Sequence, residues 1–211
     1  AQDRPAGLAG TIMTSPNLEE IASQVAAVLG GDGDDYALIG GLAVGAHGFV
    51  RATADIDFVV RDLARASTRL QQHGLRVEQL RGSFSCLRGT IETIRFDVLP
   101  PLVPILWDRT ISVDLGDGST LRVVDLDSLI RLKLKAAGPK DLMDVAALAQ
   151  LHPEIRERAR EQAVAYRIVD KLDAWLQDPR LQAELVEQQA SERPRRRRES
   201  STKATRTRSR S

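Results

Sequence analysis

The fold of this chain is decided by residues 36–60, which read YALIGGLAVGAHGFVRATADIDFVV. Residues 36–39 are a short apolar run, typical of a buried strand, and Gly40-Gly41 ends it. Residues 42–47 then predict a short helix. Residues 54–60 alternate carboxylates with apolar side chains, as a strand with one polar edge does. The stretch therefore predicts a strand, a glycine turn, a helix and a second strand.

Two carboxylates, Asp55 and Asp57, interrupt that second strand. Residues two apart on a strand point to the same face, about 6–7 Å from each other. Two carboxylates placed this way can share divalent cations, which prefer hard oxygen ligands and support two-metal phosphoryl chemistry. The Asp-x-Asp pattern also occurs at 32/34 and 125/127, where a turn and a helix cap explain it. Only the 55/57 pair lies in an apolar strand, where an unpaired carboxylate is costly.

Gly40 and Gly41 are candidates for phosphate binding. Bare backbone N–H groups at the start of a helix can hold a triphosphate, although a glycine pair also forms an ordinary turn, as we expect at residues 30–31. A third carboxylate, Asp97, lies in the apolar run 94–99 and joins the first two if the strands are neighbours. Glu92 competes for this role, but it falls on the opposite face of the strand from Asp97.

The remaining sequence predicts an α+β fold. Helical periodicity covers residues 17–29 and 62–73, the second ending at Gly74. Strand-like stretches lie at 75–80, 83–87, 90–99, 111–115 and 120–124. The glycine turns between them predict that they pair as antiparallel hairpins. Helices follow at 126–137 and 140–151, with two more ending near residue 189. The expected organisation is a disordered extension over 1–14, an α+β core over 15–124, a helical region over 125–190 packed on the core, and a disordered basic tail over 191–211. Residues 1–12 read as tag or spurious sequence ahead of Met13.

Composition excludes several classes of protein. With 211 residues, 42% of them hydrophobic, the chain is too long for a disulfide-stapled miniprotein. No apolar run approaches the roughly 20 residues that span a bilayer, and the first residues show no signal-peptide pattern. The single cysteine, Cys86, can form no internal disulfide. We therefore expect a cytoplasmic protein with a buried thiol and no membrane partner.

Charge is distributed unevenly along the chain. Residues 191–211 hold nine Lys or Arg and two Glu, so this tail carries +7 while residues 1–190 carry −6. The tail has almost no apolar side chains with which to offset the entropy of ordering. It is either a solvated terminus or a segment that contacts nucleic acid through the phosphate backbone.

Taken together, the motifs carry a family resemblance. The order Ile39-Gly40-Gly41, thirteen residues, Asp55-Ile56-Asp57, and Asp97 on a later strand resembles the signature of the polymerase-beta-type nucleotidyltransferase superfamily. The sequences GGLAVGAHG at 40–48, RATADID at 51–57 and DSLIRLKLKAAGPKDLMDV at 127–145 are similar to its minimal prokaryotic branch, which includes the AbiEii-type toxins of toxin–antitoxin systems. The resemblance covers residue 17 to about residue 151.

The resemblance implies a fold and an activity. The fold is a mixed sheet with flanking helices, followed by a helical carboxyl-terminal half. The activity moves a nucleoside monophosphate from an NTP to a hydroxyl of RNA, such as tRNA, or of a protein, as the toxin of a toxin–antitoxin pair. Asp55, Asp57 and Asp97 would hold two Mg²⁺ ions, or Mn²⁺, and Asp97 would also assist deprotonation of the acceptor hydroxyl. Gly40 and Gly41 would bind the nucleotide phosphates, and Lys133 would pair with the triphosphate.

Further binding residues are expected around this site. Arg51 and Thr53 precede the carboxylate strand and could orient the phosphates or the carboxylates. Asp141 and Asp144 share one helix face, which either turns toward the site or leaves Asp141 to complement the helix dipole. The family often has an arginine where this chain has Gly138, and either Lys135 or Lys140 could take its place.

Other functions remain open at this stage. His47, His73 and His152 lack metal-ligand spacing, and we expect them to be structural. The aromatic residues are too scattered to form a stacking platform for single-stranded nucleic acid. One alternative is a catalytically weak nucleotide-binding or scaffold protein of the same fold. Another is a nucleotidyltransferase that modifies a small molecule such as an antibiotic.

Overall fold

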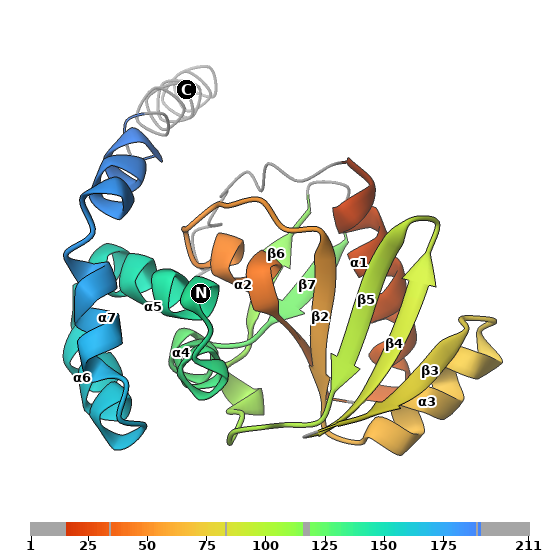
Figure 1. Ribbon diagram of the computed structural model, residues 1–211. Helices are drawn as coiled ribbons and strands as arrows, with labels where there is room; N and C mark the ends of the chain where they lie inside the picture. The colour runs from red at the N-terminus through yellow and green to blue at the C-terminus, as the bar shows by residue number, and fades with distance from the viewer. Residues whose placement is uncertain (1–15, 34, 83, 116–118, 189, 191–211) are drawn as a thin grey trace, which may run out of the picture.

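The architecture is a seven-stranded mixed sheet with helices on both faces and a helical half beside it (Figure 1). The computed structural model describes residues 16–33, 35–82, 84–115, 119–188 and 190. The strand order is β3-β4-β5-β2-β1-β7-β6. This arrangement confirms the predicted α+β class. The predictions for residues 1–14 and 191–211 lie outside the described residues.

The strands and helices follow the sequence pattern closely. The strands are β1 (Tyr36–Ile39), β2 (Asp55–Val60), β3 (Val77–Arg81), β4 (Ser85–Ile91), β5 (Ile94–Leu99), β6 (Ile111–Asp114) and β7 (Thr120–Val123). The helices are α1 (Pro16–Leu29), α2 (Gly40–Ala46), α3 (Leu63–Gln72), α4 (Leu126–Ala136), α5 (Pro139–Leu151), α6 (Arg156–Ala165) and α7 (Val169–Leu176). Short 3₁₀ turns lie at Gly31–Gly33, Trp107–Arg109 and Pro153–Ile155.

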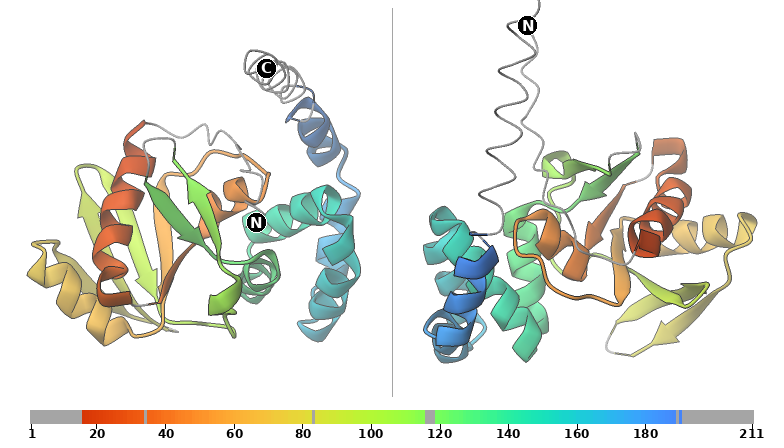
Figure 2. Two further views of the ribbon diagram at one scale, coloured as in Figure 1. Left: turned by 180° about the vertical axis from the view of Figure 1, so that it is seen from behind. Right: turned by 90° about the horizontal axis from the view of Figure 1, so that it is seen from above.

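Helices α1 and α3 cover one face of the sheet, as the view from behind shows (Figure 2). In α1, Leu18, Ile21, Val25 and Leu29 recur at helical spacing, and all four are buried. Helix α3 begins where the Asp62 side chain accepts a hydrogen bond from the Arg65 N–H. Helix α2 lies on the opposite face, in front of β1 and β2 (Figure 1). One face of the sheet is therefore covered by α1 and α3, and the opposite face is only partly covered, by α2.

The strand register places the three predicted carboxylates together. Strand β2 lies between β1, which runs antiparallel to it, and β5, which runs parallel. Asp57 is opposite Ile39 on one side and opposite Asp97 on the other. Directly opposed residues of paired strands face the same side of a sheet. The expectation that the strand of Asp97 neighbours the strand of Asp57 is thus confirmed.

The hairpin formed by β4 and β5 corrects two predictions about residues 83–99. Gly89 does not separate two strands, because β4 runs through it, and Glu92 lies in the turn between β4 and β5 with φ 55°. A glycine inside a strand often marks a close approach rather than a turn. Here a Cβ at Gly89 would collide with the Phe96 ring on β5. Glu92 is consequently placed away from the carboxylate cluster.

Replacing Gly89 by alanine is expected to destabilise the hairpin. The added methyl has no room beside the Phe96 ring, and overpacking of a well-packed core costs about 1–3 kcal/mol. Urea unfolding measures the loss, and Gly82→Ala is the matched control, because a Cβ at Gly82 meets nothing within 4 Å. Equal stability of the two variants would show that the Phe96 contact does not constrain this position.

The carboxyl-terminal half contains one more helix than expected. After the predicted breaks at Gly138-Pro139 and Pro153, residues 156–188 form α6, α7 and a further helix over 179–188 rather than two helices. Arg167 adopts φ 59° between α6 and α7. No helix in the described part of the chain is long and apolar enough to cross a bilayer. Cys86 is buried, as predicted.

Candidate active site

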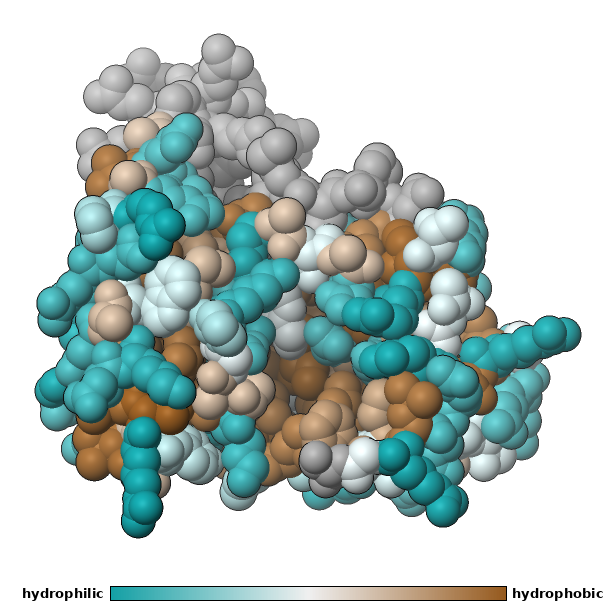
Figure 3. Space-filling view, in the orientation of Figure 1, coloured by the Kyte–Doolittle hydropathy of each residue, from teal (hydrophilic) through white to brown (hydrophobic). Residues whose placement is uncertain are grey.

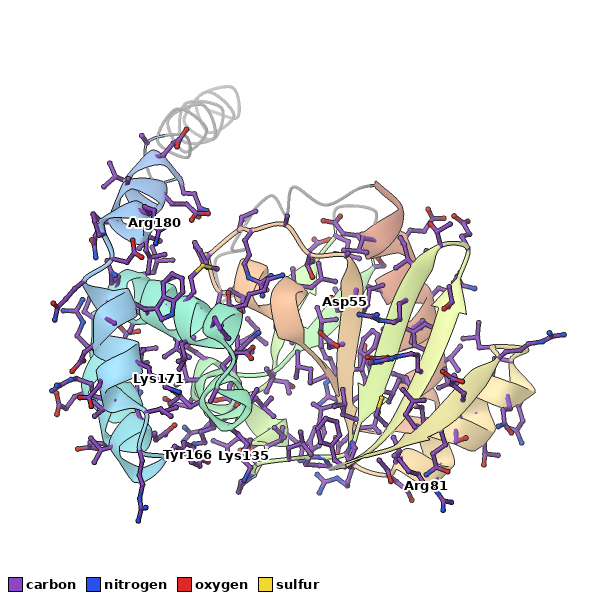
Figure 4. All side chains as sticks on the ribbon, in the orientation of Figure 1. Asp55, Arg81, Lys135, Tyr166, Lys171 and Arg180 are labelled. Carbon is purple, nitrogen blue, oxygen red and sulfur yellow. The ribbon has the colours of Figure 1, made fainter. Side chains whose placement is uncertain are left out.

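The site is built on one face of the paired strands β2 and β5. Asp55 and Asp57 project from β2, and Asp97 projects from β5 directly opposite Asp57. Asp97 is buried, whereas Asp55 and Asp57 are partly exposed. Figure 4 shows Asp55 on the strand that leads away from the loop following α2. Three carboxylates from two neighbouring strands therefore share one small region of the sheet.

The glycine pair lies directly against this region. Gly40, with φ +69°, begins α2, and a Cβ there would collide with the Asp57 carboxylate. A Cβ at Gly41 would lie 2.7 Å from the Thr53 Oγ1. Both positions thus require glycine for close approach, and Gly40 also for its left-handed backbone. The glycines, Thr53 and the carboxylates form one compact arrangement, in which Thr53 donates to the Asp55 Oδ1 at 3.3 Å.

Gly40→Ala is expected to perturb both backbone and site. A left-handed alanine costs about 1–2 kcal/mol, and contact with Asp57 adds a packing penalty of about 1–3 kcal/mol. Gly74→Ala is the matched control, because Gly74 has φ +77° and open space around its Cβ position. Thermal unfolding of the two variants separates the backbone penalty, which both share, from the packing penalty, which only Gly40→Ala incurs. If Gly40→Ala is no less stable than Gly74→Ala, the predicted collision with Asp57 does not occur.

Asp57 carries the most perturbed carboxyl group of the cluster. Burial, together with the negative charges of Asp55 and Asp97, raises its pKa to about 6. The nearby Lys133 and Arg95 oppose this rise. The site therefore disfavours the ionised form of Asp57, and a bound cation would offset this.

Two arginines hold the outer carboxylates of the cluster. Arg88 on β4 donates to both oxygens of Asp97, each at 2.8 Å, and Arg95 on β5 donates to Asp55 at 2.5 Å. Burial by itself would raise the pKa of Asp55, but the hydrogen bond and charge of Arg95 lower it overall. Neither arginine was predicted from the sequence as part of the site. Arg95 could have been predicted, because a residue two positions from Asp97 on the same strand lies on the same face. Arg88 could be found only from the register between β4 and β5.

The donor set suits a hard divalent cation. Three carboxylates on one face offer the oxygen ligands that Mg²⁺ and Mn²⁺ prefer, and burial and the charges of Asp55 and Asp97 disfavour the ionised form of Asp57. In the described residues, no three acidic, His or Cys side chains are already arranged as a metal site. Asp55 and Asp97 are each paired with an arginine.

A buried ion network lies beside the carboxylates. Asp144 accepts from Arg51 at 2.5 and 2.7 Å and lies 2.8 Å from the Lys133 Nζ, which also donates to Asp141 at 2.9 Å. The network joins the loop before β2 to α4 and α5. Asp141 and Asp144 therefore both contact Lys133 from one face of α5. Lys133 has three N–H donors, so one remains beyond these two contacts.

The two lysines proposed to replace the family arginine lie in different surroundings. Lys140, in the first turn of α5, is close enough for its charge to lower the pKa of Asp55. Lys135 instead lies 5.9 Å from the centre of the Tyr166 ring, far from Asp55 in Figure 4. Only Lys140 is therefore positioned to act at the site.

The histidines hold backbone carbonyl groups. The ring nitrogens of His47, His73 and His152 lie 2.8–2.9 Å from the carbonyl oxygens of Val124, Arg69 and His47, respectively. These contacts agree with the structural role predicted for them. Burial lowers the pKa of His47 by disfavouring the charged imidazolium form.

Comparison with solved structures identifies the fold of this chain, whereas comparison of sequences finds no match. The sequence matches no protein-family profile and no curated protein. The crystal structure of ANT(2″)-Ia in complex with adenylyl-2″-tobramycin is similar over 72% of this chain and 98% of its own, with a TM-score of 0.53 and 15% identity. This chain has a nucleotidyltransferase fold.

Two further structures agree with this assignment. The solution structure of the antibiotic-resistance factor ANT(2″)-Ia has a TM-score of 0.52 and 16% identity, covering 72% of this chain and 91% of its own. JHP933 from Helicobacter pylori has a TM-score of 0.50 and 18% identity, covering 90% of this chain and 97% of its own. Its coverage of this chain extends the likeness beyond the sheet into the helical half.

Proposed function

We propose that this protein is a Mg²⁺-dependent nucleotidyltransferase that moves a nucleoside monophosphate from an NTP to a hydroxyl group of RNA. The observation that carries the proposal is the register of β2 and β5, which sets Asp57 opposite Asp97 and against Gly40. A nucleotidyltransferase fold with these residues at that place has the donors that the reaction needs.

In the proposed reaction, residues of this chain bind the triphosphate and accept the proton of the attacking hydroxyl. The backbone at Gly40 and Gly41 holds the triphosphate, with Lys133 and Lys140 balancing its charge. Asp97 accepts the proton of the acceptor hydroxyl, whose oxygen forms a bond to the α-phosphorus as the bond to the leaving pyrophosphate breaks. Asp55, Asp57 and Asp97 would hold two metal ions, which supply Lewis-acid stabilisation of the attacking and leaving oxygens. Arg51 and Thr53 position Asp144 and Asp55.

Transfer is tested with each α-labelled NTP in turn, Mg²⁺, and total bacterial RNA plus protein extract. The matched control is the Asp55→Asn/Asp57→Asn variant. Label that enters RNA only with the intact aspartates supports the proposal and names the preferred base. Label in protein would move the acceptor to a protein hydroxyl. If no label enters either fraction while NTP still binds, the chain is a nucleotide-binding protein without transfer activity.

A small-molecule acceptor is the second candidate function. The similarity to ANT(2″)-Ia, solved with adenylyl-2″-tobramycin, favours it. Aminoglycosides carry no phosphate, however, whereas the rim of the proposed site presents Arg88 and Arg95, whose guanidinium groups match a phosphodiester acceptor. Adding tobramycin and unlabelled RNA together with labelled NTP distinguishes the two acceptors, because the label follows the preferred one.

The proposal includes a toxin role and an antitoxin partner, which rest on the sequence resemblance to AbiEii-type proteins. Induced expression in a bacterial host should stop growth for the natural chain and not for Asp55→Asn/Asp57→Asn. Continued growth with the active chain would remove the toxin role while leaving the enzyme activity intact.

The basic segment 191–211 is proposed to assist acceptor binding. In the preceding helix, Gln188 donates from its Nε2 to the Val50 carbonyl at 2.6 Å, and Val50 precedes Arg51 in the loop before β2. Deleting residues 191–211 is expected to raise the apparent KM for tRNA and to flatten its salt dependence, because seven net positive charges are removed. The KM for NTP should not change. Unchanged tRNA kinetics would exclude a role for this segment.

A further inference from the structure

The carboxylate face of the sheet continues beyond the proposed catalytic residues onto β4 and β3. Register pairs Asp97 with Arg88, and Arg88 with Glu78 on β3. Thr90 is paired in the same way with Arg95. The described helices leave the front of β4 and β5 uncovered, and hydrophilic side chains gather over this part of the surface (Figures 1 and 3). One polar surface thus extends from Asp97 to the edge strand.

This surface contains a shallow, open depression of about 390 Å³, which we call the pocket. Its polar lining comes from Arg76, Glu78, Arg88 and Thr90, with Val77 and Gly89 between them. Arg76 and Arg88 bring guanidinium groups, which match phosphate oxygens in geometry and charge, and Thr90 brings a hydroxyl donor.

Arg88 links this pocket to the reacting group. Its guanidinium donates two hydrogen bonds to Asp97 and also lines the pocket. A guanidinium has five N–H donors, so three remain beyond the two given to Asp97. The pocket therefore lies one side chain away from the carboxylate that receives the proton of the acceptor hydroxyl in the proposed reaction.

Glu78 makes the pocket selective within the class of phosphate-bearing ligands. Its carboxylate lies beside Arg88, because the two residues are directly paired between β3 and β4. A carboxylate repels a phosphate, but it accepts a hydrogen bond from a ribose 2′-hydroxyl, the group that distinguishes RNA from DNA. Two guanidinium groups beside one carboxylate are therefore suited to a ribose and its phosphate together.

We infer that this pocket, formed by Arg76, Glu78, Arg88 and Thr90, is an acceptor subsite that binds a ribonucleotide of the RNA strand next to the attacking hydroxyl. The inference rests on the proposed function, because the pocket lies beside the reacting hydroxyl only if Asp97 accepts the proton of that hydroxyl. It favours a phosphodiester acceptor over a protein hydroxyl, which would bring no phosphate to the two arginines.

The test compares the full chain with two variants of equal charge change. Arg76→Gln alters the pocket at an exposed residue placed outside the catalytic machinery. Arg81→Gln is the matched control, because Arg81 ends β3 on the opposite face and lies well away from Asp55 in Figure 4. The probe is a short fluorescein-labelled single-stranded RNA, with the DNA of the same sequence beside it, and the readout is fluorescence anisotropy at several salt concentrations.

Arg76→Gln is expected to weaken RNA binding about tenfold, as the loss of a charged hydrogen bond to phosphate does, and to lower the salt slope by about 1. Arg81→Gln should change neither quantity. Glu78→Gln should narrow the difference in affinity between RNA and DNA. If Arg76→Gln and Arg81→Gln bind RNA alike, or if Glu78→Gln leaves the RNA preference unchanged, the subsite is overturned.

Calorimetric titration of NTP with Mg²⁺ on the same three variants keeps this failure separate from that of the proposed function. Unchanged NTP affinity with weakened RNA binding supports the subsite. NTP binding and label transfer that persist while the RNA results are negative would remove the subsite and leave the transferase proposal standing. Absence of NTP binding in the natural chain would instead remove the transferase proposal, and with it the placement of the pocket beside a reacting hydroxyl.

Discussion

Asp57→Asn is expected to abolish nucleotidyl transfer and, at the same time, to stabilise the metal-free protein above pH 6. The carboxylate supplies a metal ligand worth several kcal/mol of transition-state stabilisation, so transfer should fall by at least about 10³-fold. The stability effect has the opposite sign, because the fold raises the pKa of Asp57 to about 6 from an ordinary value of 3.8.

The pH dependence of that effect follows from proton linkage. Between pH 3.8 and about 6 the folded state binds more protons at Asp57 than the unfolded state, so stability falls as pH rises through this window. Above it the ionised carboxylate costs up to about 3 kcal/mol, which Asn does not incur. The variant and the natural chain should therefore have similar stability near pH 3.5 and diverge by pH 7. Urea unfolding at both pH values, without divalent cations, measures the divergence.

Asp55→Asn provides the control two residues away on the same strand. The pKa of Asp55 is lowered overall by Arg95 despite its burial, so its ionised form stabilises the fold above the ordinary carboxyl pKa and loses that contribution as pH falls. Asp55→Asn should therefore reduce stability at pH 7 where Asp57→Asn increases it. If both variants changed the stability at pH 7 in the same direction, the opposite pKa shifts assigned to Asp55 and Asp57 would be wrong.

Asp144→Ala is expected to be the most destabilising single substitution near the site. The Asp144 side chain is 0% exposed and compensates Arg51 and Lys133, which are 8% and 9% exposed. Removing one partner of a buried ion network leaves uncompensated buried charge, which costs about 3–5 kcal/mol. Thermal and urea unfolding should show a loss of this size, together with weaker NTP binding because Lys133 and Arg51 lose their positions.

Asp141→Ala is the matched comparison. Asp141 also contacts Lys133, but its side chain is 26% exposed, so water replaces much of the lost contact. We expect a loss of about 1 kcal/mol or less. A double substitution, Asp144→Leu with Lys133→Met, tests the electrostatic origin. It leaves one buried cation, Arg51, without Asp144, where Asp144→Ala leaves both Arg51 and Lys133, so it should be less destabilising if unpaired buried charge is the cause. Additive losses would point to packing instead.

The sequence by itself determined most of the secondary structure and the identity of the carboxylates. Period-two spacing puts Asp55 and Asp57 on one strand face, and helical spacing defines α1, α3, α4 and α5, because these patterns depend on neighbours only a few residues apart. Apolar neighbours also singled out Asp97 over Glu92. Local pattern failed at Gly89, where the glycine makes room for the Phe96 ring on another strand, and at the boundary between α6 and α7.

Tertiary structure decided which side chains meet. That Arg88 holds Asp97 depends on the register between β4 and β5, and one residue of slip would turn Arg88 to the other face. Asp144 compensates Arg51 although 93 residues separate them, and Lys140 rather than Lys135 reaches the site because α4 turns Lys135 toward Tyr166. Contacts of this kind depend on how strands pair and helices pack over long separations, and a single sequence carries no local pattern that records them.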